Sequence, residues 1–527
     1  MSEPAELFRY LLLTVYIGTL IAVAFYGMHR YVLVYLYMKH RNNVHQPKGV
    51  FPKDALPRVT IQLPMFNEDT VAERVIRATC QVDYPLDRLE IQVLDDSTDH
   101  SAEIARKACE EWAAKGYPIK YIHRTNRTGY KAGALAAGLK QASGDYVAIF
   151  DADFIPPRDI LTNVLDHFTD DAVGMVQIRW DHLNRNASIL TRSQAIFLDG
   201  HFVIEHTARN RSGRFMHFNG TAGVWRRTTI DDAGGWEHDT LTEDLDLSYR
   251  AQMKGWQFVY LPQYAAPAEL PPEMIGFKQQ AHRWTKGSFQ TAIKLLPKIL
   301  RSRLPYRVKT EAFFHLTNTL VYPLMVLLTV LIYPIFYMYV EDPHIEAPLK
   351  HNEWGRFIFT LSLFILATCS ASMFFVVGQR ELLGKQAGWK TILYLPFLMS
   401  LGVGVGLNNA KAVLEAIWGA IRRKPSEFVR TPKYGMTGGG QFRSTAKVFT
   451  AKKLTLPILE IAFGCYMTAC IAISVWYGFG MTSIPFLMIF AGGYFYVGFA
   501  SIHTLYKMHR EAEIEAELAA DAEPVST

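Results

Sequence analysis

The sequence predicts an α/β catalytic domain, built on a mostly parallel doubly wound sheet, joined to an α-helical membrane domain. Two observations carry this prediction. Short apolar segments alternate with helical segments between about residues 55 and 300, and long apolar runs dominate the chain from about residue 310 onward. Alternating strand and helix signals are typical of βαβ units, and apolar runs of about 20 residues are long enough to cross a bilayer.

Composition supports a membrane protein with more than one folding unit. The chain has 527 residues, of which 50% are hydrophobic and 13% aromatic. Its net charge of +6 suits a membrane surface or an anionic substrate better than duplex nucleic acid, so we expect no nucleic-acid partner. The five cysteines follow no metal-ligand or disulfide spacing, which indicates free thiols.

The N-terminal residues 1–45 are predicted to form a transmembrane anchor. An apolar run extends from about Leu11 to Tyr26 and is followed by Arg30, Lys39 and Arg41 rather than by a small-residue cleavage site. A basic flank of this kind favours the cytoplasmic side of a membrane.

Residues 55–268 alternate strand and helix signals. The predicted strands are Val59–Leu63, Leu89–Leu94, Ile119–His123 and Tyr146–Phe150, and the predicted helices are Val71–Cys80, Ala102–Ala114 and Lys131–Ala142. In parallel sheets of this type ligands bind beyond the carboxyl ends of the strands. Acidic residues follow two of these strands, which predicts a site there.

The remaining chain is predicted to form interface and membrane segments. Residues 269–305 mix aromatic residues with lysines, as in amphipathic interface helices. Residues 310–507 hold apolar runs near 315–337, 356–378, 391–407, 454–478 and 482–505, and residues 508–527 form an acidic tail. Basic residues place both loops 379–390 and 419–453 in the cytoplasm. The run 391–407 then either dips into the bilayer and returns, or the shorter loop is an exception.

Asp151 and Asp153 are candidate metal ligands. They lie one residue apart directly after a predicted buried strand. Hard carboxylate oxygens suit Mg²⁺ or Mn²⁺, and such an ion neutralises a diphosphate leaving group. The alternative is a solvated Asx turn.

Two further acidic motifs have similar alternatives. Asp95 and Asp96 can accept hydrogen bonds from a nucleoside, or the same segment can cap a helix. Thr242, Glu243 and Asp244 can supply a general base toward an acceptor hydroxyl, or can place acids at a helix N-terminus.

A basic and aromatic motif follows in the predicted interface segment. Arg283 can neutralise a diphosphate through a forked contact, Trp284 can stack on a sugar ring, and Gln280 lies one turn before them. The alternative is interfacial anchoring, where Trp and Arg are common.

These four motifs, in this order, resemble the family 2 glycosyltransferases, especially the processive membrane branch that contains cellulose, mannan, hyaluronan and chitin synthases. The resemblance covers nearly the whole chain and implies a GT-A catalytic fold. It implies nucleotide contacts at Asp95 and Asp96, metal and diphosphate binding at Asp151 and Asp153, a catalytic Thr242-Glu243-Asp244 motif with Asp244 as base, and contacts from Gln280, Arg283 and Trp284 to the diphosphate and the acceptor end.

Other segments resemble further family elements. These are a first donor-binding loop with Pro64, Asn67 and Glu68, a phosphate-proximal Lys131, an acceptor loop with Phe218, Gly220 and Thr221, and a gating loop with Phe428, Thr431 and Lys433. The last segment departs from the family pattern, because Arg430 replaces an apolar residue.

The stretches 91–99 and 218–246 look most like plant cellulose-synthase-like mannan and xyloglucan-backbone enzymes. The resemblance implies a hexosyltransferase that uses UDP-glucose or GDP-mannose to extend a β-linked, β-1,4 polysaccharide, with export through the membrane region. Its catalytic domain would face the cytoplasm, and the protein would be a multi-pass protein of the cell or inner membrane, or of the Golgi. Two alternatives stay open: transfer of a single sugar to a lipid, and a transporter with an inactive domain.

Overall fold

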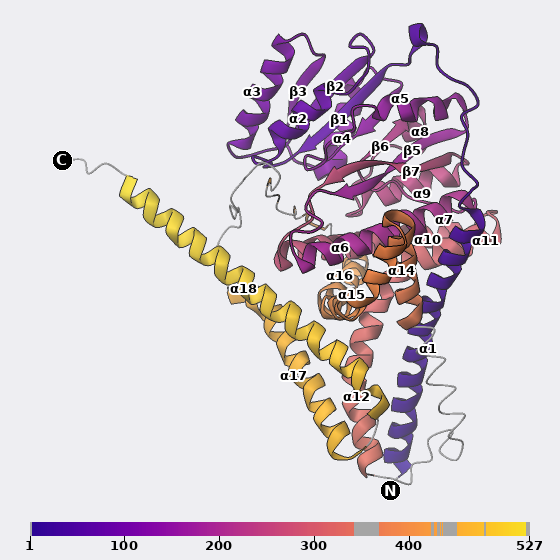
Figure 1. Ribbon diagram of the computed structural model, residues 1–527, viewed down its shortest axis with the longest axis vertical. Coiled ribbons are helices and arrows are strands. Elements are labelled where there is room, and N and C mark those ends of the chain that lie inside the picture. Colours follow the sequence, from indigo (N-terminus) through magenta and orange to yellow (C-terminus); the bar gives the residue numbers. More distant parts are fainter. Residues whose placement is uncertain are drawn as a thin grey trace.

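The computed structural model describes residues 3–341, 368–422, 426–428, 430, 433, 435, 451–478 and 481–522. An α/β domain occupies one end of the long axis, and long helices extend from it toward the other end (Figure 1). A belt of further helices lies between these two parts.

The α/β domain is built on a seven-stranded sheet with the order β3-β2-β1-β4-β6-β5-β7. The strands are β1 Val59–Met65, β2 Leu89–Asp95, β3 Ile119–His123, β4 Tyr146–Ile149, β5 Val173–His182, β6 Gly223–Arg226 and β7 Gln257–Ala268. Only β6 runs antiparallel to its neighbours, so the prediction of a mostly parallel sheet is confirmed. The four predicted strands are β1 to β4.

Both faces of the sheet are buried, which explains why the central strand β4 is continuously apolar. Along β4, Tyr146 and Ala148 belong to one hydrophobic core, whereas Val147 and Ile149 belong to the other. The surrounding helices are α2 Ala72–Cys80, α3 Ser101–Ala114, α4 Tyr130–Gln141, α5 Ile160–Val164, α8 Arg227–Asp232 and α9 Glu243–Met253, with short 3₁₀ turns at Lys53–Ala55 and Leu165–Thr169. This double cover leaves the strand ends as the accessible part of the sheet.

The belt connects the sheet to the membrane helices. It consists of α6 Ile189–Asp199, the π-helix η3 Gly200–His206, α7 Thr207–Arg211, α10 Met274–Arg301, α11 Tyr306–Thr317 and the 3₁₀ turn Asn318–Leu320. The predicted interface segment is therefore one helix, α10, which packs against α9 in the catalytic domain and against α16 and α18.

The described residues contain five helical segments that are long and apolar enough to cross a membrane, namely Glu6–His40, Tyr306–Ile335, Lys385–Arg422, Thr455–Trp476 and Ile484–Glu511. They correspond to the predicted anchor and to four of the predicted apolar runs. The helices concerned are α1 Glu3–His40, α12 Val321–Glu341, α15 Lys385–Gly404, α16 Gly406–Arg422, α17 Thr455–Trp476 and α18 Ile484–Ala522, with 3₁₀ turns at Ala451–Leu454 and Met481–Ser483. The predicted run 356–378 lies mostly outside the described residues; its end belongs to α14 Ser370–Leu383.

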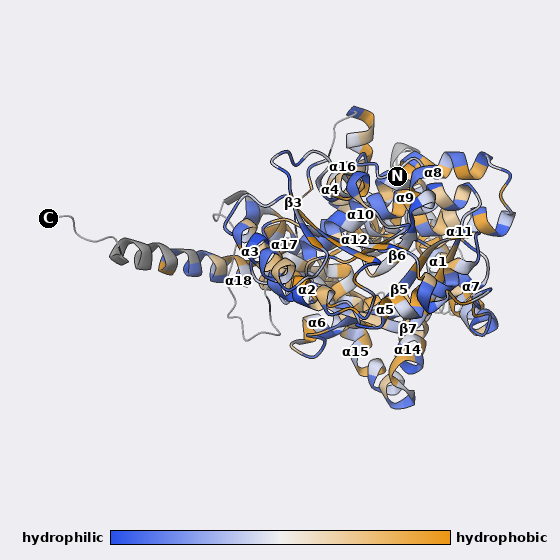
Figure 2. Cartoon of the chain, turned by 90° about the horizontal axis from the view of Figure 1, so that it is seen from above, coloured by the Kyte–Doolittle hydropathy of each residue, from blue (hydrophilic) through white to orange (hydrophobic). Residues whose placement is uncertain are grey.

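The ambiguous run 391–407 spans the junction of α15 and α16. In Figure 1 these two helices are seen nearly end-on, while α1, α12 and α17 follow the long axis. The pair therefore lies across the other membrane helices, which favours the alternative in which this run is not a simple span. Beyond the other helices α18 projects away from the rest of the chain, and the turns of this projecting part that are coloured by hydropathy are largely hydrophilic (Figure 2).

Candidate active site

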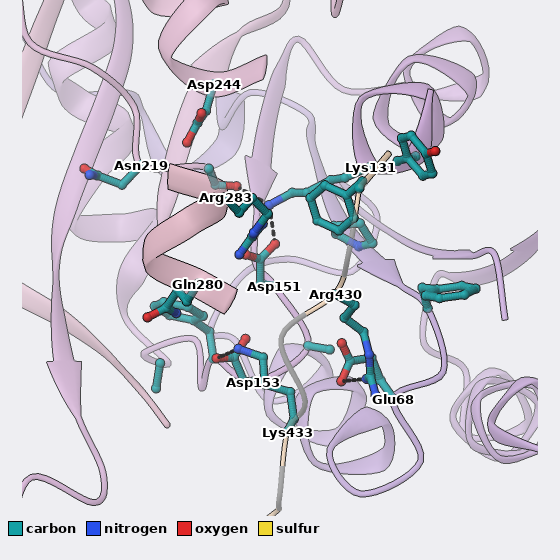
Figure 3. A pocket seen from close by; sticks show the side chains of 18 of the residues that line it. Glu68, Lys131, Asp151, Asp153, Asn219, Asp244, Gln280, Arg283, Arg430 and Lys433 are labelled. Carbon is teal, nitrogen blue, oxygen red and sulfur yellow. Dashed lines mark hydrogen bonds and ion pairs between the residues drawn. The ribbon is translucent and has the colours of Figure 1, made fainter. Parts of the chain in front are cut away.

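A pocket opens at the carboxyl ends of the central strands, between the sheet and α10. It encloses about 1200 Å³ when its open mouth is included. Fifteen residues singled out from the sequence line it: Pro64, Glu68, Asp96, Lys131, Asp151, Asp153, Gly220, Thr242, Glu243, Asp244, Gln280, Arg283, Trp284, Phe428 and Lys433. Figure 3 shows many of their side chains converging from separate elements.

Asp151 and Asp153 lie at the end of β4, each beside a lysine. The backbone N–H of Asp151 donates to Thr221 Oγ1 at 2.9 Å. Lys131 donates to the Asp151 carboxylate and to the carbonyl oxygen of Gly220. Lys433 donates to Asp153 Oδ2 at 2.5 Å. The two carboxylates supply hard oxygen donors on one rim of the pocket, so the donor set fits Mg²⁺ or Mn²⁺.

Asp244 lies in the first turn of α9, beside Glu243. Burial, reinforced by the neighbouring Glu243 carboxylate, raises the pKa of Asp244 to about 7. Burial also raises the pKa of Glu243, against the opposing effect of Lys131. A carboxyl group with a pKa near neutrality is suited to accept a proton at physiological pH.

Gly220 approaches Asp244 closely. Its φ is +79°, and a Cβ at this position would lie 3.0 Å from Asp244 Oδ2. Only glycine combines this left-handed backbone with the missing side chain. Gly220 therefore leaves room in front of the acidic motif.

Arg283 is a cation without a counter-ion in the described part of the chain. Its guanidinium lies over the ring of Phe428, 4.8 Å from the centroid, and its buried Nε has no hydrogen-bond partner. Burial lowers its pKa, although several carboxylates of the pocket, Glu243 first among them, act in the opposite direction. A desolvated guanidinium that makes no ion pair among the described residues indicates an anionic ligand.

The two adjacent aspartates at the end of β2 have different surroundings. Asp96 lines the pocket and is held by Arg124, whose Nε donates to Asp96 Oδ1 at 2.7 Å. Asp95 is fully buried and accepts hydrogen bonds from Tyr121 and from the backbone N–H of Ser97. It lies outside the pocket lining, because successive side chains at a strand end point in opposite directions.

Three other predicted residues support the pocket from behind. Asn67 accepts a hydrogen bond from the backbone N–H of Thr98 and so joins the loops after β1 and β2. Phe218 is buried against Trp225, with ring centroids 5.6 Å apart, and the buried Thr221 holds Asp151 as described above. None of the three lines the cavity, and Thr431 lies outside the described residues.

Arg430 lines the pocket together with the predicted residues Phe428 and Lys433, although the sequence did not indicate a role for it there. Arg430, the departure from the family pattern, forms an ion pair with Glu68 at 2.7 Å. Burial raises the pKa of Glu68 to about 7 in spite of this partner.

Trp180 is a second lining residue that the sequence did not indicate, and the centroid of its ring lies 6.4 Å from that of Trp284. Its position near the end of β5 was the available signal, since Asp96, Asp151 and Asp153 also lie at strand ends.

Acidic residues at strand ends, an arginine without an ion pair among the described residues and two tryptophans give this pocket groups suited to a sugar and a diphosphate. The sequence pattern of the family described as "Glycosyltransferase like family 2" matches residues 57–287. A rice protein, "Probable glucomannan 4-beta-mannosyltransferase 9" (Oryza sativa subsp. japonica), is 33% identical over 471 residues, covering 86% of this chain and 82% of the relative.

Two further comparisons complete the set. "Glucomannan 4-beta-mannosyltransferase 1" of the same organism is 45% identical over 254 residues, which is 47% of this chain and about half (49%) of the relative. A solved mannosyltransferase from Pyrobaculum calidifontis, PcManGT in complex with GDP-Man and Mn²⁺, has a TM-score of 0.48 at 23% identity and covers 71% of this chain and 99% of its own.

The chain belongs to the family 2 glycosyltransferases, in the cellulose synthase-like group that includes the glucomannan mannosyltransferases. It is a glycosyltransferase with a GT-A catalytic fold, as the resemblance in the sequence predicted.

Proposed function

We propose that this enzyme transfers mannosyl residues from GDP-mannose to the end of a growing β-1,4-linked mannan or glucomannan. The relatives named above are 4-β-mannosyltransferases, and the identity reaches 45% over an aligned stretch of 254 residues. This support favours GDP-mannose over UDP-glucose. The single structural observation that carries the proposal is the presence, in one pocket, of a carboxyl group with a near-neutral pKa and an arginine that has no counter-ion among the described residues.

Asp244 is proposed as the general base. Its carboxylate accepts the proton of the acceptor hydroxyl, whose oxygen attacks the anomeric carbon from the face opposite the nucleotide. A single displacement of this kind inverts the α linkage of the donor to β. The elevated pKa supports this role, since proton transfer is most efficient when the pKa of the base lies near the working pH.

Arg283 is proposed to bind the departing diphosphate, with Gln280 on the preceding turn of α10. A divalent cation held by Asp151 and Asp153 would supply further neutralisation of the leaving group. Lys131, which contacts Asp151 and the carbonyl of Gly220, keeps the first aspartate turned toward the pocket.

The acceptor is proposed to lie against Trp284, Trp180 and Gly220. The two indole rings form an apolar wall on which sugar rings can stack, and Gly220 leaves space in front of Asp244. Because α10 carries Trp284 and packs against α16 and α18, the acceptor side of the pocket adjoins the membrane helices. We propose that the polymer leaves in that direction.

A donor panel tests the proposal. The purified full-length protein in lipid nanodiscs is incubated with labelled GDP-mannose or UDP-glucose and Mn²⁺. We expect a product from GDP-mannose that β-mannanase degrades. A product formed only from UDP-glucose would overturn the choice of donor, and a single organic-extractable glycolipid would overturn the polymer acceptor.

A further inference from the structure

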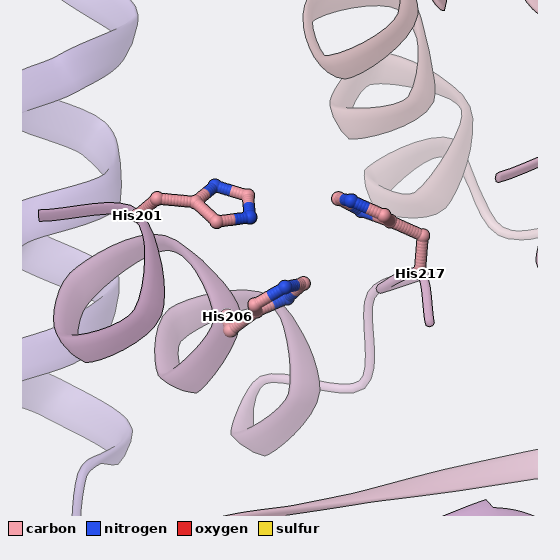
Figure 4. A group of neighbouring side chains, drawn as sticks. All are labelled: His201, His206 and His217. Carbon is pink, nitrogen blue, oxygen red and sulfur yellow. The ribbon is translucent and has the colours of Figure 1, made fainter. Parts of the chain in front are cut away.

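Three histidines gather around Asn219, next to Gly220 of the acceptor loop, and the proposed transfer reaction uses none of them. His201 and His206 lie on the π-helix η3, and His217 lies in the segment that leads to Gly220. One ring nitrogen from each histidine lies within 4.8 Å of one ring nitrogen from each of the other two. Figure 4 shows the rings turned toward a common point.

The local backbone explains this convergence. His201 and His206 are five residues apart, a spacing that places side chains on different faces of an α-helix. In a π-helix the hydrogen bonds join residues i and i+5, so the two rings lie one above the other. Their centroids are 4.4 Å apart, and the ring of His217 lies 4.9 Å from that of His206.

The side-chain amide of Asn219 marks the point on which the rings converge. Its nitrogen lies 3.1 Å from Nε2 of His201 and 3.1 Å from Nε2 of His217. An amide nitrogen only donates, so both imidazoles present lone pairs to it. Nε2 of the third histidine, His206, lies 2.6 Å from the amide oxygen of Asn219. Two lone pairs aimed at one partially positive group form an arrangement that also suits a cation.

A carboxylate orients one of these rings. Nδ1 of His201 lies 2.9 Å from Glu205 Oε2, so Nδ1 carries the proton and Nε2 stays free to bind. Metal-binding histidines usually donate their second N–H to a carboxylate in this way. Among the described residues the buried Nδ1 atoms of His206 and His217 have no hydrogen-bond partner, so each ring can carry its proton on Nδ1 once Asn219 is displaced.

The cluster is shielded from bulk water, since His206 is fully buried and His201 and His217 are partly buried. Arg209 lies nearby, but it forms ion pairs with Glu205 and Glu311 at 3.2 and 2.9 Å.

We propose that His201, His206 and His217 form a binding site for Zn²⁺ or a similar late transition-metal divalent cation, and that the ion displaces the amide of Asn219. Imidazole nitrogens favour such ions, whereas the oxygen donors of Asp151 and Asp153 favour Mg²⁺ or Mn²⁺, so the two sites differ in selectivity. Because Asn219 lines the pocket next to Gly220, an ion at this site would fix the acceptor loop to the belt.

Metal binding to the full-length protein in detergent, without any donor, tests this proposal independently of the transfer reaction. After treatment with a chelator, the protein is dialysed against Zn²⁺ and its metal content measured. We expect one retained equivalent, an affinity at least 100-fold weaker in His206→Gln and in His217→Gln, and a tetrahedral Co²⁺ absorption band in the wild type. Asn219→Ala, which removes the displaced amide, should bind more tightly.

His45→Gln is the matched control, since His45 contacts a single further histidine, His167, at 3.0 Å. This variant, and the double variant Asp151→Asn with Asp153→Asn, should retain zinc as the wild type does. Unchanged zinc binding in both cluster variants would overturn the site. If those variants fail to fold, as judged by size-exclusion chromatography, the wild-type Co²⁺ spectrum decides, and a missing tetrahedral band overturns it.

Discussion

Asp244→Asn is the substitution that tests the proposed mechanism most directly. Asparagine keeps the size of the side chain and cannot accept the proton. General-base catalysis contributes about 10²–10⁴-fold, so we expect kcat to fall by about that factor. The KM for the donor should stay within a few-fold of the wild-type value, because the groups proposed to bind the diphosphate are unchanged.

The pH dependence gives the same prediction a second readout. With the pKa of Asp244 raised to about 7, its carboxylate fraction rises from about 9% at pH 6 to about 91% at pH 8. The value of kcat/KM should therefore rise about tenfold across this range in the wild type. In Asp244→Asn the residual activity should lack this rise.

Stability should change in the opposite direction from activity. Burial holds the pKa of Asp244 at about 7 in the folded protein, against 3.8 ordinarily. The charged form is thus penalised in the folded state, and stability is lost as the pH rises from about 3.8 through about 7, by at most about 4 kcal/mol. The cavity reduces this figure, since part of the carboxylate meets water. Asp244→Asn should therefore melt at a higher temperature than the wild type at pH 8, with a smaller difference at pH 5.

The control is Asp231→Asn, on the exposed part of α8, which should change neither activity nor pH profile. The assay is transfer from labelled donor in nanodiscs between pH 5.5 and 8.5, with donor binding measured by calorimetry. The reasoning fails if Asp244→Asn retains more than about a tenth of wild-type turnover, since a base contributes at least about 10²-fold, or if its pH profile matches that of the wild type.

Three other substitutions test separate parts of the pocket. Arg283→Ala should weaken GDP binding by about 10–100-fold, as expected for charge-assisted hydrogen bonds of about 1.5–3 kcal/mol. The control Lys286→Ala, one turn further along α10, should leave GDP binding unchanged. Equal affinities of Arg283→Ala and the wild type for GDP, measured by calorimetry, would contradict this prediction. Gly220→Ala should lower kcat at least tenfold by crowding the proposed base, while Gly213→Ala, with a similar φ of +67° but a nearest neighbour at 3.6 Å, should affect only stability. Lys433→Met should lower the Mn²⁺ concentration for half-maximal activity, because the second aspartate of the metal motif loses a competing cation; an unchanged metal requirement would count against this competition.

Local sequence patterns predicted much of the fold and of the site. The apolar segments before Asp95 and Asp151 form strands β2 and β4, and the parallel sheet brings their ends together. Three of the four motifs, with Asp96 from the remaining one, line a single pocket. The signals for strands and for membrane helices each lie within one segment of the sequence, so they can be recognised without any knowledge of the tertiary structure.

Contacts between distant segments could not be predicted in this way. The ion pair between Arg430 and Glu68 joins residues that no local pattern relates, and so does the convergence of His217 with the π-helix. The transverse position of α15 and α16 likewise depends on packing against α10 and α18, because hydropathy alone does not distinguish a helix across the bundle from one along it.

The sequence by itself therefore determined the class of the protein, since a donor-binding motif needs only its residues and a preceding strand. The tertiary structure decided which member of each motif faces the pocket. Asp95 and Asp96 are equivalent in the sequence, yet only Asp96 lines the cavity, because a strand end turns adjacent side chains to opposite sides. It also decided that Arg283 is left without a counter-ion among the described residues, which depends on every carboxylate placed around it.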